Sequence, residues 1–157
     1  QVESEVTIVP MLRIATLPAN EVELRIEPDS GFSARKGAAG RLGGGLLRRH
    51  RVLLDPGAGR MVLAPAARSE WPVTRSTSGL MVGQRGDRLR VLHVMRGSPA
   101  AADWQAGMEI CAVDGSPIPA LYASSPLANW STGAPGRVVR LLRCDGSEHS
   151  LTLARFY

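Results

Sequence analysis

Three histidines, His50, His93 and His149, are the side chains whose type best suits general-base chemistry near neutral pH. A hydrolase that uses histidine in this way needs a nucleophile on a tight turn, and the sequence contains no Gly-x-Ser-x-Gly segment. None of the three has a metal-binding partner at a recognised spacing. We therefore interpret them as strand residues that face solvent or make a hydrogen bond, and we expect no metal and no cofactor.

Glycine-rich corners raise the alternative of phosphate binding. The segment "GQRGDR" at 83–88 has the glycines, but it lacks the Lys-Ser or Lys-Thr and the helix that a P-loop requires. Asp55 closes an apolar run before "PGAG", and we interpret it as a turn-forming side chain. Neither feature predicts catalysis.

Two cysteines, Cys111 and Cys144, lie in apolar strand contexts with no histidine or cysteine at metal-ligand spacing. We expect both to be buried small hydrophobic residues. A disulfide between them is the alternative, so the cysteines leave the redox compartment open.

The composition limits the classes of protein to consider. At 157 residues the chain can form one ordinary domain or two small ones. Its net charge of +5 comes almost wholly from arginines spread along the predicted strands, with few aromatic residues to stack on bases, so we expect no nucleic-acid partner. No apolar run approaches the roughly 18 to 20 residues that cross a bilayer, and Gln1 opens no signal peptide, so we expect no membrane insertion in this chain.

Short alternating runs bounded by Gly, Pro, Asp or Asn predict many strands and little helix. The predicted strands are "EVTIVPMLRIA", "EVELRIEP", "HRVLLDP", "RMVLAP", "GLMVG", "RLRVLHVM", "EICAVDG", "RVVRLLR" and "SLTLARFY". Helical turns are expected only near Leu46, at 99–104, and from Pro126 with Ser125 as its cap. The stretch 64–78 has the composition of a linker. We therefore divide the chain into segments 1–66 and 78–157, joined by a linker at 67–77.

The second segment carries spaced motifs in a recognisable order. In "GSPAAADWQAGMEICAVDGSPI" a Gly-Ser-Pro-Ala corner leads to a short helix, Gly107 ends it, and Asp114-Gly115 makes a tight turn. This stretch resembles the core signature of bacterial PDZ domains, and "APGRVVRLLRCDGSEHSLTL" resembles their closing hairpin. Met108 departs from the acidic residue that the family usually has after that glycine. The resemblance implies a small, partly open β-barrel with two short helices over residues 78–157.

A PDZ domain binds the C-terminal tail of a peptide or protein as an added strand, and consecutive N–H groups of a glycine-containing turn hold its carboxylate. The resemblance places this turn at Ser78-Gly79-Leu80-Met81. Gly79 permits the backbone conformation that such a turn needs. Leu80 and Met81 would then line the pocket for the first side chain of the tail.

The opposite wall of that peptide groove would be the helix that begins at Pro126. Leu127 and Trp130 are three residues apart and would share one face of it. The alternative for Leu80, Leu127 and Trp130 is a place in the hydrophobic core.

The first segment resembles a second family. In "AGRLGGGLLRRHRVLLDPGAGRMVLAP" a Gly-x-Leu-Gly corner leads to a short helix, a strand ending in Asp, a turn and a final strand, and "VTIVPMLRIATLPANEVELRIEP" supplies a strand pair before it. These features resemble the last part of bacterial retropepsin-like aspartyl proteases, with Arg41 in place of an apolar corner residue. In that family a PDZ domain often follows, and the bacterial periplasm or cell envelope is suggested by the family alone. The fold class expected is therefore mainly β, with an incomplete acid-protease-like segment at 1–66 and a PDZ domain after it.

Catalysis in that family needs an Asp-Thr-Gly or Asp-Ser-Gly at the end of an apolar strand, because two aspartates share a proton across a water. Asp29-Ser30-Gly31 spells the triplet, but it follows "RIEP" and lies shortly before the Gly-x-Leu-Gly corner. We interpret Asp29 as a loop residue and expect no complete catalytic centre in this chain.

Three functions remain open at this point. The first is a regulatory or substrate-recruiting module that binds peptide or protein C-terminal tails and is attached to the non-catalytic remainder of an aspartic peptidase. The second is an active dimeric aspartic peptidase that uses Asp29, and the third is a structural interaction domain whose groove is filled by its own chain. The apolar strands of residues 1–66 are expected to pair with another copy, to dock on the PDZ segment or to be poorly ordered.

Overall fold

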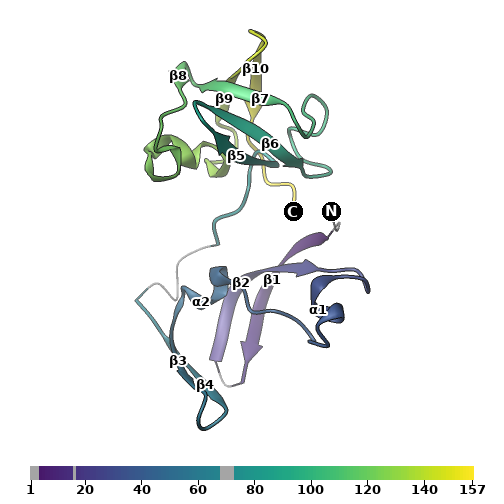
Figure 1. The fold of residues 1–157 in the computed structure, drawn as a ribbon, viewed down its shortest axis with the longest axis vertical. Coiled ribbons are helices and arrows are strands. Elements are labelled where there is room, and N and C mark those ends of the chain that lie inside the picture. The colour runs from purple at the N-terminus through teal and green to yellow at the C-terminus, as the bar shows by residue number, and fades with distance from the viewer. Residues whose placement is uncertain (1–3, 16, 68–72) are drawn as a thin grey trace. The chain divides into compact units, whose positions relative to one another are not determined.

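The computed structural model describes residues 4–15, 17–67 and 73–157 (Figure 1). Its described part is mainly β, its helices are short, and its strand pairs are antiparallel. The chain divides into two compact units, with the boundary between Val73 and Thr74. This boundary lies inside the stretch 67–77 that the sequence assigns to a linker.

The first unit contains two separate hairpins and two single-turn helices. Its elements are β1 (Glu5–Ile14), β2 (Leu17–Ile26), α1 (Phe32–Arg35), α2 (Gly44–Leu47), β3 (His50–Asp55) and β4 (Arg60–Pro65). Its small core consists of the buried Ala19, Val22 and Leu46, with Val9, Leu12, Ile14 and Leu24 partly buried around them. Arg49 links α2 to β2, because its guanidinium donates to the carbonyl oxygens of Asn20 (2.7 Å) and Glu21 (3.2 Å).

The turn between β3 and β4 is built by Asp55, as the sequence predicts. Its carboxylate accepts hydrogen bonds from the N–H of Ala58 (3.1 Å) and from Nε of Arg60 (3.1 Å). The two strands pair without a break from His50↔Pro65 to Asp55↔Arg60. No third strand joins this hairpin within the described residues.

The second unit is a larger open sheet. Its strands are β5 (Leu80–Arg85), β6 (Arg88–Val94), β7 (Glu109–Val113), β8 (Ser116–Pro117), β9 (Val138–Arg143) and β10 (Glu148–Thr152). They follow the order β10-β9-β7-β6-β5, with β8 paired to β7, so β5 and β10 lie at the two ends (Figure 1). Two 3₁₀ helices, η1 (Tyr122–Ser124) and η2 (Pro126–Thr132), lie between β8 and β9 in the chain.

Alternation along these strands builds one continuous core. In β7 the bulge interrupts the alternation, and Ile110, Ala112 and Val113 are all buried. In β6 and β9, Leu89, Val91, Val139 and Leu141 are fully buried between more exposed strand neighbours. This period of two is the one expected for an antiparallel sheet with one face covered. The sheet does not close into a barrel within the described residues. The structure therefore confirms the mainly β class, while the partly open barrel stays a prediction.

The turn that the sequence predicts at 99–104 is formed, but the short helix that the PDZ resemblance implies there is not. The segment is a series of turns, with hydrogen bonds from the N–H of Ala101 to Ser98 O (3.0 Å) and from the N–H of Trp104 to Ala100 O (3.0 Å). Only the second bond has helical spacing, and an isolated helical turn is costly to form unless further bonds extend it. Trp104 is buried in the core, and the chain turns again at Gly107, whose φ is +96°.

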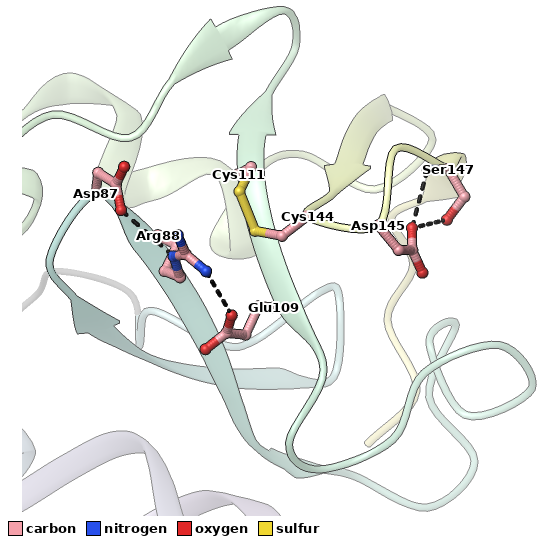
Figure 2. The surroundings of a disulfide bond; sticks show 7 residues. All are labelled: Asp87, Arg88, Glu109, Cys111, Cys144, Asp145 and Ser147. Carbon is pink, nitrogen blue, oxygen red and sulfur yellow. Dashed lines mark hydrogen bonds and ion pairs between the residues drawn. A yellow bond between two sulfur atoms is a disulfide. The ribbon is translucent and has the colours of Figure 1, made fainter.

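The expectation of two free, buried cysteines is wrong, because Cys111 and Cys144 form a disulfide with Cα atoms 5.1 Å apart (Figure 2). The register of β7 against β9 shifts between Ile110 and Ala112, so Cys111 is the extra residue of a β-bulge. A bulge changes the direction of a side chain. Cys144 follows the end of β9, where its N–H donates to Glu109 O (3.1 Å), and the two sulfur atoms meet. Strand contexts in the sequence reveal neither the bulge nor the pairing.

Candidate functional site

The strand β5 lies at one end of the six-stranded sheet. Within the described residues it pairs only with β6, from Leu80↔Val94 to Arg85↔Arg88, with a register shift between Met81 and Val82. An edge strand offers N–H and C=O groups to which another strand can add. β5 is therefore the place in this unit where a peptide strand has a backbone to pair with.

The turn that leads into β5 depends on glycine at position 79. The φ angle of Gly79 is +79°, a region that side chains disfavour. A Cβ atom there would also lie 2.0 Å from Cβ and 2.1 Å from Oγ of Ser98, so a larger residue has no room. The carbonyl of Gly79 accepts the N–H of Met95 (2.9 Å), and that of Ser78 accepts the N–H of Ala100 (3.2 Å). The Gly-Ser-Pro-Ala corner thus fixes the turn in front of the edge strand.

Two hydroxyl oxygens occupy the consecutive N–H groups of this turn. The N–H of Gly79 donates to Oγ of Ser76 (3.0 Å), and the N–H of Leu80 donates to Oγ of Ser78 (3.1 Å). Both donors belong to the turn at 78–81, to which the PDZ resemblance assigns a peptide carboxylate. Sequence reasoning missed Ser76, because a hydroxyl three residues before a glycine turn is common in loops that bind nothing.

The structure brings the six predicted groove residues into one region. Leu80 and Trp130 belong to the same core cluster, and Leu127 packs against that cluster partly buried. The end of η2 is held to the strand that enters the turn, because Ser131 O accepts the N–H groups of Thr77 (2.9 Å) and Ser78 (3.2 Å). The turn and η2 are therefore neighbours.

These residues differ in how much surface they leave for a ligand. Leu80 and Trp130 are only 4% and 2% exposed, so they support the site from the core. Met81 is 46% exposed, and Leu127 keeps part of its surface. Leu127 and Trp130 share one side of η2, because residues three apart eclipse in a 3₁₀ helix.

Trp130 is fixed by a hydrogen bond inside the core. Its Nε1 donates to Oη of Tyr122 (2.9 Å), which joins η2 to η1. Burial raises the pKa of the Tyr122 hydroxyl, and the hydrogen bond from Trp130 acts in the opposite direction. This pair orients η2, and with it Leu127, toward the turn.

The end of the chain lies beside the same turn. The N–H of Ala154 donates to Thr77 O (2.9 Å), so the chain after β10 pairs with the residue just before Ser78. Further along, Cζ of Phe156 would be 3.5 Å from a Cβ atom at Gly79. The chain's own tail thus reaches the place where the sequence predicts a peptide end.

A second feature is a shallow cavity of about 530 Å³ beside the disulfide, which the sequence did not predict. Its charged side chains are already paired with one another or with neighbours (Figure 2). Arg88 pairs with Glu109 (3.0 Å), and the pKa of Arg88 is raised by that bond and by Asp87. Asp145 accepts the N–H (2.9 Å) and the hydroxyl (2.6 Å) of Ser147, which lowers the pKa of its carboxyl. The cavity therefore has the properties of a structural ion-pair network.

The remaining lining charge, Arg143, is also engaged. Its guanidinium lies over the ring of Trp104 at 5.1 Å, approaches Nε2 of His149 (3.2 Å), and contacts Sδ of Met108. His149 is thus a hydrogen-bonded strand residue, as predicted, and His50 likewise contacts Leu46 O through Nδ1 (3.0 Å).

Asp29 lies in an exposed turn between β2 and α1. The turn is closed by a hydrogen bond from the N–H of Gly31 to Pro28 O (2.7 Å), and Gly31 begins α1 as its N-cap. The Asp-Ser-Gly triplet therefore connects a strand to a short helix at the surface.

The described part of the chain has neither a cluster of metal ligands nor a helix that could span a membrane. It contains no group of three or more His, Cys, Asp or Glu side chains placed to hold a metal ion. Its helices lack the length and apolar character needed to span a bilayer.

Comparison with known proteins identifies no relative. No protein-family model, curated protein sequence or solved structure matches this chain.

Proposed function

We propose that the second unit is a PDZ-like module that binds the C-terminal tails of peptides or proteins along β5. The main support is the pair of consecutive N–H groups at Gly79 and Leu80, placed where an edge strand begins and already bound to oxygen atoms. A carboxylate would present two oxygens in place of the hydroxyls of Ser76 and Ser78. Hydrogen bonds from N–H groups to a charged acceptor are roughly twice as strong as those to a neutral one, so this exchange is favourable.

The rest of the tail would pair with β5 as an added strand. Met81 and Leu127 supply apolar surface for the last side chain of the tail. Main-chain pairing with one or two pockets leaves little free energy after the peptide is ordered, so a dissociation constant of roughly micromolar or weaker is expected.

The experiment is a titration of the full chain with peptides that end in an apolar residue, prepared as free acids and as C-terminal amides. Backbone amide shifts recorded by NMR should move at Gly79, Leu80 and residues 126–131 with the free acids. The amides should bind at least about tenfold more weakly, because they lack the charge that the two N–H groups recognise. Equal binding of acids and amides, or no response in these segments, would contradict the proposal.

A pair of matched variants tests the groove wall. Leu127→Glu places a negative charge beside the tail carboxylate and should abolish binding of the free acids. Leu121→Glu, at a site that is 77% exposed outside η2, should leave binding unchanged. If the two variants behave alike, η2 is not a wall of the site.

A second candidate function is a structural module whose groove is occupied by its own chain. It is favoured by the hydrogen bond of Ala154 to Thr77 and by Phe156 beside Gly79. Deletion of residues 155–157 separates the two functions. A peptide-binding module should keep its affinity within about twofold, whereas a self-filled groove should bind peptides only after the deletion.

We further propose that the first unit is the C-terminal part of a retropepsin-like aspartyl protease domain. Support comes from the order of β3, a turn and β4 after a helical turn at the Gly-rich corner, and from Asp29 in a surface turn. This proposal predicts that the chain has no protease activity. A pepstatin-sensitive cleavage that is lost in Asp29→Asn would instead favour an active dimeric peptidase.

The disulfide between Cys111 and Cys144 supports an oxidising compartment for the protein, because such bonds are rare in reducing cytosol. Alkylation of thiols in freshly lysed cells, followed by mass spectrometry, tests this. Recovery of both cysteines in the alkylated form would contradict it.

A further inference from the structure

The β3–β4 hairpin exposes an unusual amount of apolar surface for a two-stranded element. Its exposed apolar side chains are Val52 (40%), Leu53 (60%), Leu54 (66%), Met61 (43%) and Val62 (44%). A hairpin on its own is marginally stable, and an exposed apolar edge is a template for another strand.

The two edges of this hairpin are not equivalent. Proline blunts a sheet edge because it cannot donate a hydrogen bond, and β1, β2 and β4 contain Pro10, Pro18 and Pro65 respectively. β3 contains no proline. Of the four strands in the first unit, β3 is therefore the one best able to accept a further strand.

The backbone groups that β3 turns outward can be assigned from the register. Ala66 donates its N–H to Arg49 O (3.2 Å), and the pairing continues unbroken to Asp55↔Arg60. Since these groups alternate in an antiparallel pair, odd-numbered residues of β3 bond to β4. The N–H and C=O groups of Val52 and Leu54 consequently point away from β4.

The order of charges in β3 identifies the strand that fits. In an antiparallel pair of two β3 strands centred on Leu53, Val52 lies opposite Leu54 of the second copy. Each pair of this kind exchanges two backbone hydrogen bonds. Arg51 then faces Asp55 of the second copy at both ends, and Leu53 faces its own equivalent in the middle. β4 offers no such match, since Arg60 is its only charged residue.

We propose that the protein forms a symmetric dimer in which the two β3 strands pair, giving a four-stranded sheet in the order β4-β3-β3-β4. Arg51, Leu53 and Asp55 alternate along β3 and so share one face of this sheet. Each Asp55 carboxylate keeps its own Arg60 (3.1 Å) and gains Arg51 of the second copy. The proposal concerns the first unit only and does not depend on peptide binding by the second.

The experiment measures the mass of the full chain by sedimentation velocity over a range of concentrations. The wild type should pass from monomer to dimer and form nothing larger, because the dimer pairs the outward edge of β3 in one copy with the same edge in the other. Leu53→Lys, which places two like charges at the centre, should raise the dissociation constant about tenfold or more. Val62→Lys, on β4 beside Leu53 and similarly exposed, is the matched control and should leave it within about threefold.

A charge-swap experiment then tests the register. Arg51→Glu and Asp55→Arg should each weaken the dimer, because each creates like-charge pairs at both ends. An equimolar mixture of the two variants should restore dimers, because every pair across a mixed interface is again of opposite sign. Circular dichroism checks that Asp55→Arg, which also loses its turn contacts, is folded.

Four results would overturn the proposal. Three of them are a wild type that stays monomeric at the highest concentration, a dimer that Leu53→Lys and Val62→Lys affect equally, and folded charge variants whose mixture fails to dimerise. Open-ended assemblies would also overturn it, since they require a pairing other than this closed one.

Discussion

The two units bury very different cores from similar alternating sequences. Fourteen side chains form the buried core of the second unit, whereas three form that of the first within the described residues. Leu141 is fully buried in a strand with neighbours on both sides, while Leu53 is 60% exposed in a two-stranded hairpin. The comparison teaches that the number of paired strands, more than the pattern within each strand, decides whether apolar residues become a core.

The edge strands of the two units differ as well. β3 has outward N–H and C=O groups between charged residues at its ends, and this arrangement suits stable pairing with another strand. At the start of β5 two N–H groups are bound to serine hydroxyls, and these hydroxyls could be exchanged for the oxygens of a ligand. Four predictions test this comparison, in order of decreasing effect.

The same substitution in the two cores should have unequal effects. Leu141→Ala removes a fully buried side chain and should lower the free energy of unfolding of the second unit by about 3–5 kcal/mol. Leu46→Ala should lower that of the first unit by no more than about 2 kcal/mol, because its small core can collapse around the change. Hydrogen exchange resolved by segment measures both. Equal losses would mean that the small core of the first unit is packed as tightly as that of the second.

The disulfide should stabilise the second unit alone. Replacing Cys111 and Cys144 by alanine should lower the free energy of unfolding of that unit by roughly 2–4 kcal/mol, because the bond closes a loop across 33 residues. Segment-resolved exchange in the first unit should not change. A comparable loss in both units would show that they unfold together.

Acid should weaken the second unit through Asp114. Burial acts to raise the pKa of this carboxyl, but bonds from the N–H of Arg140 (2.8 Å) and the guanidinium of Arg137 (2.7 Å) outweigh it and lower the pKa. Because the folded pKa lies below the unfolded one, the stabilisation is complete above the usual range of about 4 and is lost as pH falls through the folded value. Asp114→Asn should therefore be about 1 kcal/mol less stable at pH 7 and lose less stability than the wild type between pH 5 and 2. Denaturant titrations at several pH values measure this, and parallel curves for the two proteins would exclude the role of Asp114.

The smallest expected effect is a change in peptide affinity on removal of the Ser76 hydroxyl, which accepts the N–H of Gly79. Ser76→Ala frees the N–H of Gly79, so peptides with a free carboxylate should bind about twofold to fivefold more tightly. Ser124→Ala, which removes a hydroxyl near η2 that bonds to Leu121 O (3.2 Å), is the control and should not change affinity. Weaker binding by Ser76→Ala would mean that this hydroxyl shapes the turn instead of competing for it.

Local sequence patterns predict most of the strands of this fold. They do not predict features that depend on contacts between residues far apart in the sequence. Nine strands lie where alternation and turn residues place them, because both signals are carried by neighbours in the sequence. The disulfide was missed because it depends on a bulge that brings together residues 33 apart. The short helix that the PDZ resemblance implies at 99–104 is a series of turns in the structure.

The candidate site shows the same division. The turn at Gly79 and the start of η2 at Pro126 could be predicted, because a glycine turn and a Ser-Pro helix start each depend on a few neighbouring residues. The sequence does not predict which site residues are exposed to solvent, because the exposure of Met81 and the burial of Leu80 depend on the whole sheet. The tail beside the turn was also hidden, because nothing in Ala154 or Phe156 marks the strand against which they lie.

The close packing of Gly79 against Ser98 limits how this sequence can change over generations. Any side chain at position 79 needs both an unfavourable φ and the space that Ser98 fills, so no single substitution there is tolerated. Ser98 itself is buried, and its hydroxyl has no hydrogen-bond partner within the described residues, so alanine would serve equally well. Descendants of this chain should therefore keep glycine at 79, while position 98 can change among the small residues serine, alanine and glycine.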